Sequence, residues 1–259
     1  VTFNEGAAQT GNECAIDTSQ LAQGVVGASA RSDARLKFQV VKGEMSYNYD
    51  LPGDGTPIIV PINMGDGPYT FRVMQNTSGN NYVELFSVID NVNLSSETAP
   101  FLVPNMFVNY NESSAVVAKA RELAQGAANQ GDVVRNIYQW VVGNITYDHD
   151  KAAQLASATG YVPDPDATLA SGTGICFDYA SLGAAMLRSL GIPCQVITGY
   201  VSPDDVYHAW NMVYIDGEWI SVEISIKPNS WTRVDLTFAA SGAASTIGDG
   251  TSYTDRYTY

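Results

Sequence analysis

Hydrophobic positions in the first part of the chain alternate with polar ones over short runs, which is typical of half-buried β-strands. Turn-forming residues such as Lys42-Gly43 and Ser78-Gly79-Asn80-Asn81 separate these runs. Short strands with turn signals at this spacing indicate a small β-sandwich. The runs that predict its strands are 36–41, 44–51, 57–62, 69–75 and 82–89.

The pattern changes to helical periodicity after about residue 110. A first helix is expected to follow a cap at Ser113 or Ser114, and a second to follow a cap at Asp132. Their apolar faces, which include Trp140 of the second helix, are best explained as core.

These patterns divide the chain into three parts. Residues 1–16 are rich in Gly, Asn, Gln, Thr and Ala and are expected to be a flexible leader. Residues 17–110 are assigned to the β-sandwich-like domain, and residues 111–259 to an α+β domain that follows it.

A buried helix is expected to start at Cys176. The residues from Cys176 to Leu190 are apolar on nearly every side, and Gly191 and Pro193 end the run. The preceding stretch, 168–174, is a Gly/Ser/Thr cluster typical of a loop. At a helix N-terminus the free N–H groups and the dipole favour a thiolate and can hold an oxyanion. A lone cysteine is more often a small core residue, so Cys176 needs a partner before it indicates chemistry.

His208 is the imidazole that can serve as that partner. It lies near the start of a strand-like run, and Asp216-Gly217 predicts a two-residue hairpin turn after it. An imidazole can accept the thiol proton and return it to a leaving group at neutral pH. The other histidine, His149, is flanked by Asp148 and Asp150 and is expected to be a solvated loop residue.

Two acids compete for the third role, which is to orient the imidazole and stabilise its cation. A two-residue turn at 216–217 would pair position 225 with 208 and place Glu223 one diagonal step away. Asp235, in Trp231-Thr232-Arg233-Val234-Asp235, is the other acid. The register beyond the turn at 227–230 cannot be derived from the sequence, so strand geometry leaves both open.

Three motifs in this order resemble the transglutaminase-like superfamily. They are Gly174-x-Cys176-x-Asp178-Tyr179-Ala180, His208-Ala209-Trp210-Asn211 and Trp231-x-x-Val234-Asp235-x-Thr237, and the resemblance covers roughly 113–238. It implies a papain-like catalytic domain in which Cys176 is the nucleophile, His208 the general base and acid, and Asp235 the orienting carboxylate. Leu236 stands where proline is common in the family, and many bacterial relatives have their Asp where this chain has Glu223.

Composition narrows the classes of partner. The net charge is −14, from 13 basic and 27 acidic residues, which argues against nucleic acid and anionic membrane surfaces. No apolar run is long enough for a membrane span. The chain begins at Val1, and we expect an extracellular or cell-surface protein whose export signal has been removed. The only conceivable disulfide joins Cys14 and Cys194, which lie in different predicted domains and are not expected to pair.

The sequence therefore predicts acyl transfer on protein or peptide amides through a thioester, ending in hydrolysis or in cross-linking to an amine. The substrate is expected to be a protein or peptide, including cell-surface or cell-wall components. The alternative is a catalytically inactive binding or surface-structural protein with the same fold. No cofactor is predicted, and a metal site is not expected because two histidines and no CxxC supply too few ligands.

Overall fold

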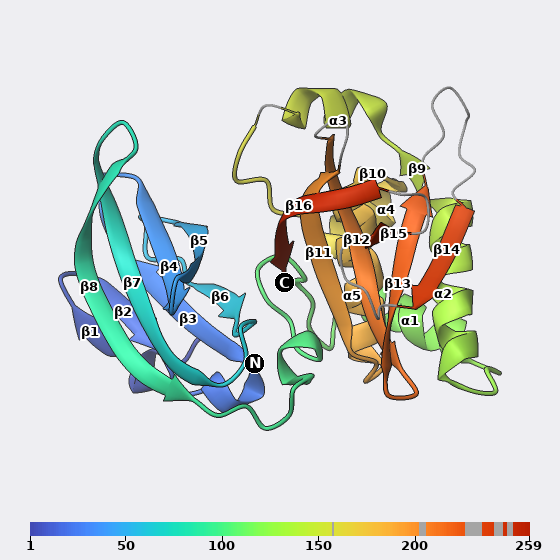
Figure 1. Ribbon diagram of the computed structural model, residues 1–259, viewed down its shortest axis with the longest axis horizontal. Helices are drawn as coiled ribbons and strands as arrows, with labels where there is room; N and C mark the ends of the chain where they lie inside the picture. Colours follow the sequence, from blue (N-terminus) through green and yellow to red (C-terminus); the bar gives the residue numbers. More distant parts are fainter. Residues whose placement is uncertain (157, 202–205, 226–234, 241–245, 248–250) are drawn as a thin grey trace. The chain divides into compact units, whose positions relative to one another are not determined.

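The computed structural model describes residues 1–156, 158–201, 206–225, 235–240, 246–247 and 251–259. For 200–201, 206–207, 223–225, 235–240, 246–247 and 251–256 it describes the backbone alone. The chain divides into two compact units, Val1–Met106 and Phe107–Tyr259 (Figure 1). The sequence had placed this boundary after residue 110.

The first unit contains two four-stranded antiparallel sheets, ordered β1-β2-β3-β6 and β5-β4-β7-β8. Alternate residues of the central strands are buried, as Phe38 and Val40 are on β4, so the pattern of period two is the reason these runs form strands. The five predicted strands correspond to β4 to β8. The strand bounds are β1 Gln9–Gly11, β2 Cys14–Asp17, β3 Val25–Ala30, β4 Leu36–Lys42, β5 Met45–Leu51, β6 Ile58–Pro61, β7 Gly67–Ser78 and β8 Asn81–Val92, with short 3-10 turns at Glu5–Ala7, Leu21–Gln23 and Ala99–Phe101.

The expectation of a flexible leader over residues 1–16 is wrong. This stretch contains β1 and most of β2, and Cys14 and Ile16 are buried in the unit. The side chain of Asp17 accepts hydrogen bonds from the backbone N–H groups of Asn4 (2.8 Å) and Ser19 (2.9 Å). Polar composition suggested a leader, but two apolar residues at alternate positions are enough to add an edge hairpin to a sheet.

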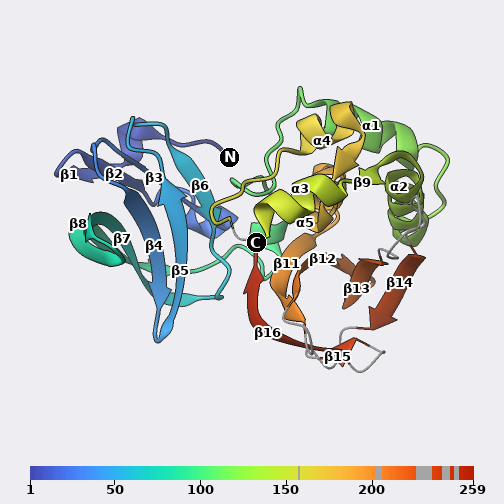
Figure 2. The same cartoon turned by 90° about the horizontal axis from the view of Figure 1, so that it is seen from above.

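The second unit places helices against one face of a six-stranded antiparallel sheet, ordered β14-β13-β12-β11-β16-β15 (Figure 2). The long helix α5 packs on β11 and β12. A separate parallel pair, β9 and β10, lies just before α3 and α5 in the chain. The helix bounds are α1 Ala115–Ala124, α2 Gln130–Asn144, α3 His149–Leu155, α4 Pro165–Ser171 and α5 Cys176–Ser189; the strand bounds are β9 Thr146–Tyr147, β10 Thr173–Gly174, β11 Cys194–Val201, β12 Val206–Ile215, β13 Glu218–Ser225, β14 Asp235–Ala240, β15 Thr246–Ile247 and β16 Thr251–Thr258.

The helices of the second unit begin and end at residues that the sequence predicted only in part. Ser114 is the N-cap position of α1, as one of the two predicted alternatives had it. Asp132 is not a cap: Asn129 precedes α2, and its side chain accepts from the backbone N–H of Asp132 at 2.9 Å. The stretch 168–174 is not all loop, because α4 runs to Ser171 and Gly172 ends it at φ +68°, a left-handed conformation that suits glycine.

The helix predicted to start at Cys176 is confirmed. Residues 177–188 are all buried, and the apolar core includes Leu182, Ala185 and Met186. The helix is buried because α1, α2 and α4 cover one side of it and the sheet covers the other. Among the described residues, no helix is both long and apolar enough to cross a membrane. All three cysteines are free.

Asn211 joins the helices to the sheet through a fully buried polar network. Its Nδ2 donates to the carbonyl oxygens of Ala180 (2.9 Å) on α5 and Gln195 (3.1 Å) on β11. Its Oδ1 accepts from the hydroxyl of Tyr138 on α2 at 2.8 Å. A Cβ on Gly183 would lie 3.0 Å from both Oδ1 of Asn211 and the Tyr138 ring, so glycine permits this close approach. The network fixes β12 against α5.

We expect Asn211→Leu to lower the free energy of unfolding by about 2–4 kcal/mol, because the Tyr138 hydroxyl and two carbonyl oxygens lose their buried partner. Tyr138→Phe is the matched control and should cost about 1 kcal/mol, since the two donors of Asn211 stay paired. Urea unfolding, monitored by tryptophan fluorescence, measures the loss of unfolding free energy in both variants. The signal reports on the second unit because all four tryptophans lie after residue 139. Equal losses in the two variants would contradict the central role of Asn211.

Candidate active site

Cys176 is the first residue of α5 and is partly exposed. Three short features precede it in the chain. Helix α4 ends at Gly172, the strand Thr173–Gly174 pairs with Thr146–Tyr147, and Ile175 is the extended N-cap residue of α5. The thiol therefore lies at the N-terminus of a buried helix, as the sequence predicted. Cys14 and Cys194 are both buried, and burial raises the pKa of Cys194 to about 12. Among the three thiols, only Cys176 combines exposure with a helix N-terminus.

Asp178, two residues after Cys176, is fully buried at 0% exposure. Its Oδ2 accepts from the backbone N–H of Ile175 at 2.9 Å, which caps the helix, and from Nζ of Lys151 at 2.8 Å. Its Oδ1 accepts from the hydroxyl of Tyr161. A Cβ on Gly174 would lie 2.7 Å from the Cβ of Asp178, so only glycine fits before the nucleophile without displacing this carboxylate.

The residues that hold Asp178 come from α3 and the segment after it. Lys151 lies on α3, with its ammonium 4.7 Å from the centre of the Tyr161 ring. Burial would lower the pKa of Lys151, but its hydrogen bonds to Asp178 and Tyr161 outweigh burial, so the pKa is raised. Burial and the hydrogen bond to Asp178 raise the pKa of Tyr161 to about 12. At neutral pH the cluster therefore holds a charged lysine and a neutral tyrosine.

His208 lies near the start of β12, where it pairs with Gly199 of β11. Its ring stacks on that of Trp210, with 5.8 Å between the centroids and 19° between the planes. The two-residue turn predicted at 216–217 is confirmed: Asp216 and Gly217 have φ of +53° and +80°, and Ile215 pairs with Glu218. The ladder between β12 and β13 is recorded as far as Asn211–Val222, so the predicted pairing of 208 with 225 lies beyond it.

Cys176 shares a cavity with the β12 residues that follow His208 in the chain. A small cavity of about 10 Å³, close to the space one water needs, is bounded on one side by the start of α5 and on the other by the sheet. The residues that line it are Cys176, Tyr179, Ala180, Ala209, Trp210, Asn211 and Val222. The structure thus brings the nucleophile candidate to the strand that carries the candidate base.

The two candidate acids lie on different strands. Glu223 is on β13, the neighbour of β12, and Asp235 begins β14, where it pairs with Ser225. The structure describes only the backbone at both positions, and 231–234, the rest of the predicted carboxylate motif, lies outside the described residues.

Tyr147 and His149 were not predicted to belong to this region. Burial raises the pKa of Tyr147 to about 12, and negative charge at Cys176, Asp148 and Asp178 acts in the same direction. The ring of His149 meets that of Tyr147 edge-on, with 4.9 Å between the centroids. His149 is exposed, as expected, but it opens α3 and is not a loop residue.

Sequence reasoning also missed Lys151, Tyr161 and the role of Asp178. The motif contained Asp178, and an acid at the third position of a helix is a known capping signal. Lys151 precedes Asp178 by 27 positions, in a stretch without a strong pattern, so nothing in the sequence joins the two.

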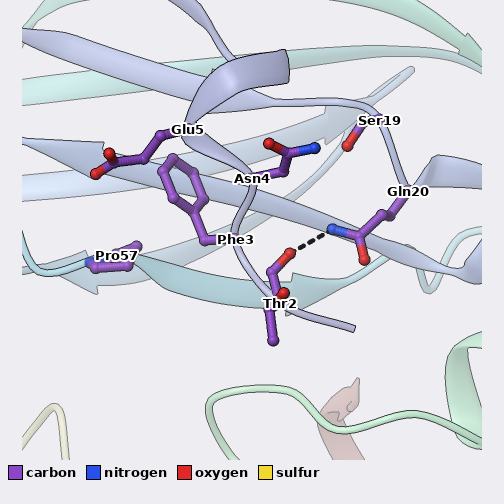
Figure 3. Close-up of a pocket in the computed structure, with 7 residues that line it drawn as sticks. All are labelled: Thr2, Phe3, Asn4, Glu5, Ser19, Gln20 and Pro57. Carbon is purple, nitrogen blue, oxygen red and sulfur yellow. Dashed lines mark hydrogen bonds between the residues drawn. The ribbon is translucent and has the colours of Figure 1, made fainter.

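A larger surface hollow of about 740 Å³ lies wholly in the first unit (Figure 3). It is polar and open, and Nε2 of Gln20 donates to the carbonyl oxygen of Thr2 at 2.6 Å across it. Both histidines of the chain are in the second unit, so its hydroxyl groups have no imidazole partner there. Its lining residues are Thr2, Phe3, Asn4, Glu5, Ser19, Gln20 and Pro57.

Comparisons with known proteins give one family match and several relatives. Residues 117–224 match the core model of the transglutaminase-like superfamily. A UPF0252 protein of Methanocaldococcus jannaschii is 25% identical over 199 residues, which are 73% of this chain and 54% of the relative. The mouse kyphoscoliosis peptidase is 31% identical over 112 residues, 39% of this chain and 16% of the relative. The chain thus spans about half of the first relative and a small part of the second.

A solved structure from Cytophaga hutchinsonii, described as a candidate cysteine protease, is 17% identical and covers 91% of this chain and 87% of its own, with a TM-score of 0.41. The family match contains Cys176, His208 and Glu223 and ends before Asp235.

Proposed function

Residues 117–224 belong to the transglutaminase-like superfamily, and we propose that the chain uses Cys176 for acyl transfer on protein or peptide amides. The observation that carries the proposal is the position of Cys176. It is a partly exposed thiol at the first position of α5, and it shares a cavity with the strand residues that directly follow His208. Nucleophile, helix N-terminus and imidazole-bearing strand are the parts that thioester chemistry requires.

The reaction proceeds in two halves. The Cys176 thiolate attacks the amide carbonyl carbon, a C–S bond forms, and the free N–H groups at the start of α5 stabilise the negative oxygen. The C–N bond then breaks, and His208 in its protonated form gives the leaving amine its proton. Water or a second amine attacks the thioester, loses its proton to His208, and releases the thiol.

Hydrolysis is the fate we favour. The mouse relative is named a peptidase, and the matching family model is that of the broad transglutaminase-like superfamily.

Fluorescein-labelled casein incubated with and without dansylcadaverine tests the proposal. Release of labelled fragments that does not depend on the amine supports hydrolysis, and dansyl incorporation into intact casein supports cross-linking. Both reactions must be absent in Cys176→Ser. If neither occurs and iodoacetamide does not label Cys176 selectively, the alternative of an inactive binding protein is preferred.

For the third role we now favour Glu223 over Asp235. The strand of Glu223 lies next to β12, whereas Asp235 lies one strand further, roughly 10 Å from β12 across the sheet. An orienting carboxylate must reach hydrogen-bond distance of the imidazole, which the neighbouring strand supports better. The family match, which includes Glu223 and ends before Asp235, supports the same choice.

Glu223→Gln is expected to lower kcat about 10²–10⁴-fold, because the imidazole loses the charge that stabilises its cation. Asp235→Asn should change kcat by less than about threefold. The control is Glu218→Gln, an exposed acid on the same strand, which should leave kcat unchanged. The opposite ranking of the first two variants, measured as casein turnover, would return the third role to Asp235.

A further inference from the structure

A buried carboxylate next to a catalytic thiol creates an electrostatic problem. Asp178 lies two positions after Cys176 and has 0% exposure, so its charge is not screened by water. An uncompensated negative charge in the first turn of α5 disfavours a thiolate at the same helix N-terminus and works against the helix dipole. The structure must therefore compensate the Asp178 charge if Cys176 is to react as a thiolate.

Lys151 supplies the compensating charge. Its ammonium donates to Oδ2 of Asp178 at 2.8 Å, and its side chain is 31% exposed while that of Asp178 is buried. The Tyr161 hydroxyl donates to the other oxygen, and the Ile175 N–H completes the set. Both oxygens of Asp178 are thus engaged, one of them by a full positive charge.

We propose that Lys151 is a positioning residue that neutralises Asp178 and thereby keeps Cys176 reactive as a thiolate. The inference rests on the proposed function, because it presumes that the Cys176 thiolate is the nucleophile. Lys151 acts through Asp178, which also caps α5, so the same ion pair ties α3 to the start of the catalytic helix.

Other titratable groups surround Cys176, and none replaces this pair. Burial raises the pKa of Tyr147 and of Tyr161 to about 12 and raises that of Tyr179 as well, so these phenols are neutral at physiological pH. In the part of the chain that the structure describes, the other titratable positions on the elements around the start of α5 are Asp148, His149 and Asp150 at the start of α3, Asp166 on α4, His208 on β12, and Glu218 and Glu223 on β13. Asp148 caps α3 through the N–H of Lys151, and Asp150 is exposed.

The test is the pH dependence of iodoacetamide labelling at Cys176, followed by mass spectrometry of its peptide. Lys151→Met should move the midpoint of labelling up by about one pH unit, because Asp178 is left uncompensated. Lys151→Arg keeps the positive charge, so its midpoint should stay close to that of the unaltered protein. The double variant Lys151→Met/Asp178→Asn removes both charges and should return the midpoint to that of the unaltered protein. Arg135→Met, which removes a cation paired with Asp132 on the surface of α2, is the matched control and should change nothing.

A midpoint in Lys151→Met equal to that of the unaltered protein overturns the inference, as does a shift that Asp178→Asn fails to reverse. If Lys151→Met does not fold, as judged by tryptophan fluorescence, the labelling midpoint of Tyr161→Phe tests the inference in its place. It removes one donor to Asp178 and should raise the midpoint by a smaller amount, and no shift counts against the inference. If Cys176 of the unaltered protein is labelled only near the ordinary thiol pKa of about 8.5, the proposed function is refuted instead.

Discussion

Cys176→Ser is expected to reduce turnover of casein by about 10⁴-fold or more, the largest effect of any single substitution in this chain. A serine hydroxyl at the same position holds its proton far more tightly than a thiol, so the attacking anion is nearly absent at neutral pH. The N–H groups of α5 and the binding surface remain, and they leave only a small residual rate. Initial rates with labelled casein measure the loss.

The matched control for this substitution is Cys14→Ser. Cys14 is buried in the first unit, and burial raises its pKa, so it is not a competent nucleophile. This variant should keep the rate within about twofold. Comparable losses in the two variants would mean that the thiol of Cys176 has no special role.

His208→Ala is expected to reduce turnover about 10²–10⁴-fold, because one imidazole serves as base in the first step and as acid when the amine leaves. Initial rates with the same casein, measured across pH, report this loss. His149→Ala provides the control. It removes the only other histidine, which is exposed at the start of α3, and should change the rate by less than about threefold. If His149→Ala caused the larger loss, the base would have to be reassigned to α3, where the ring of Tyr147 already contacts His149.

The parts of the fold that were predictable from the sequence are those with local signals. The β4 to β8 strands lie between glycine-rich turns, and α5 is an apolar run that ends before Gly191 and Pro193. The β12–β13 hairpin follows from Asp216-Gly217, since both residues adopt the positive φ that this turn requires.

The parts that were not predictable depend on partners far apart in the chain. The strands β1 and β2 lie in a stretch of polar composition; β1 pairs with β2, and β2 pairs with β3. Our preference for Glu223 over Asp235 rests on the order of β12, β13 and β14, and sequence periodicity carries no information about strand order. The Lys151–Asp178 pair likewise depends on where α3 lies, which no local pattern specifies.

In the proposed reaction Cys176 attacks as a thiolate supported by His208. The most direct test is the rate of iodoacetamide labelling at Cys176 as a function of pH, in the unaltered protein and in His208→Ala. We predict rapid labelling well below pH 8.5, the ordinary thiol pKa being about 8.5, and loss of this low-pH reactivity in His208→Ala. Slow labelling that rises only near pH 8.5, the same in both proteins, would contradict the claim.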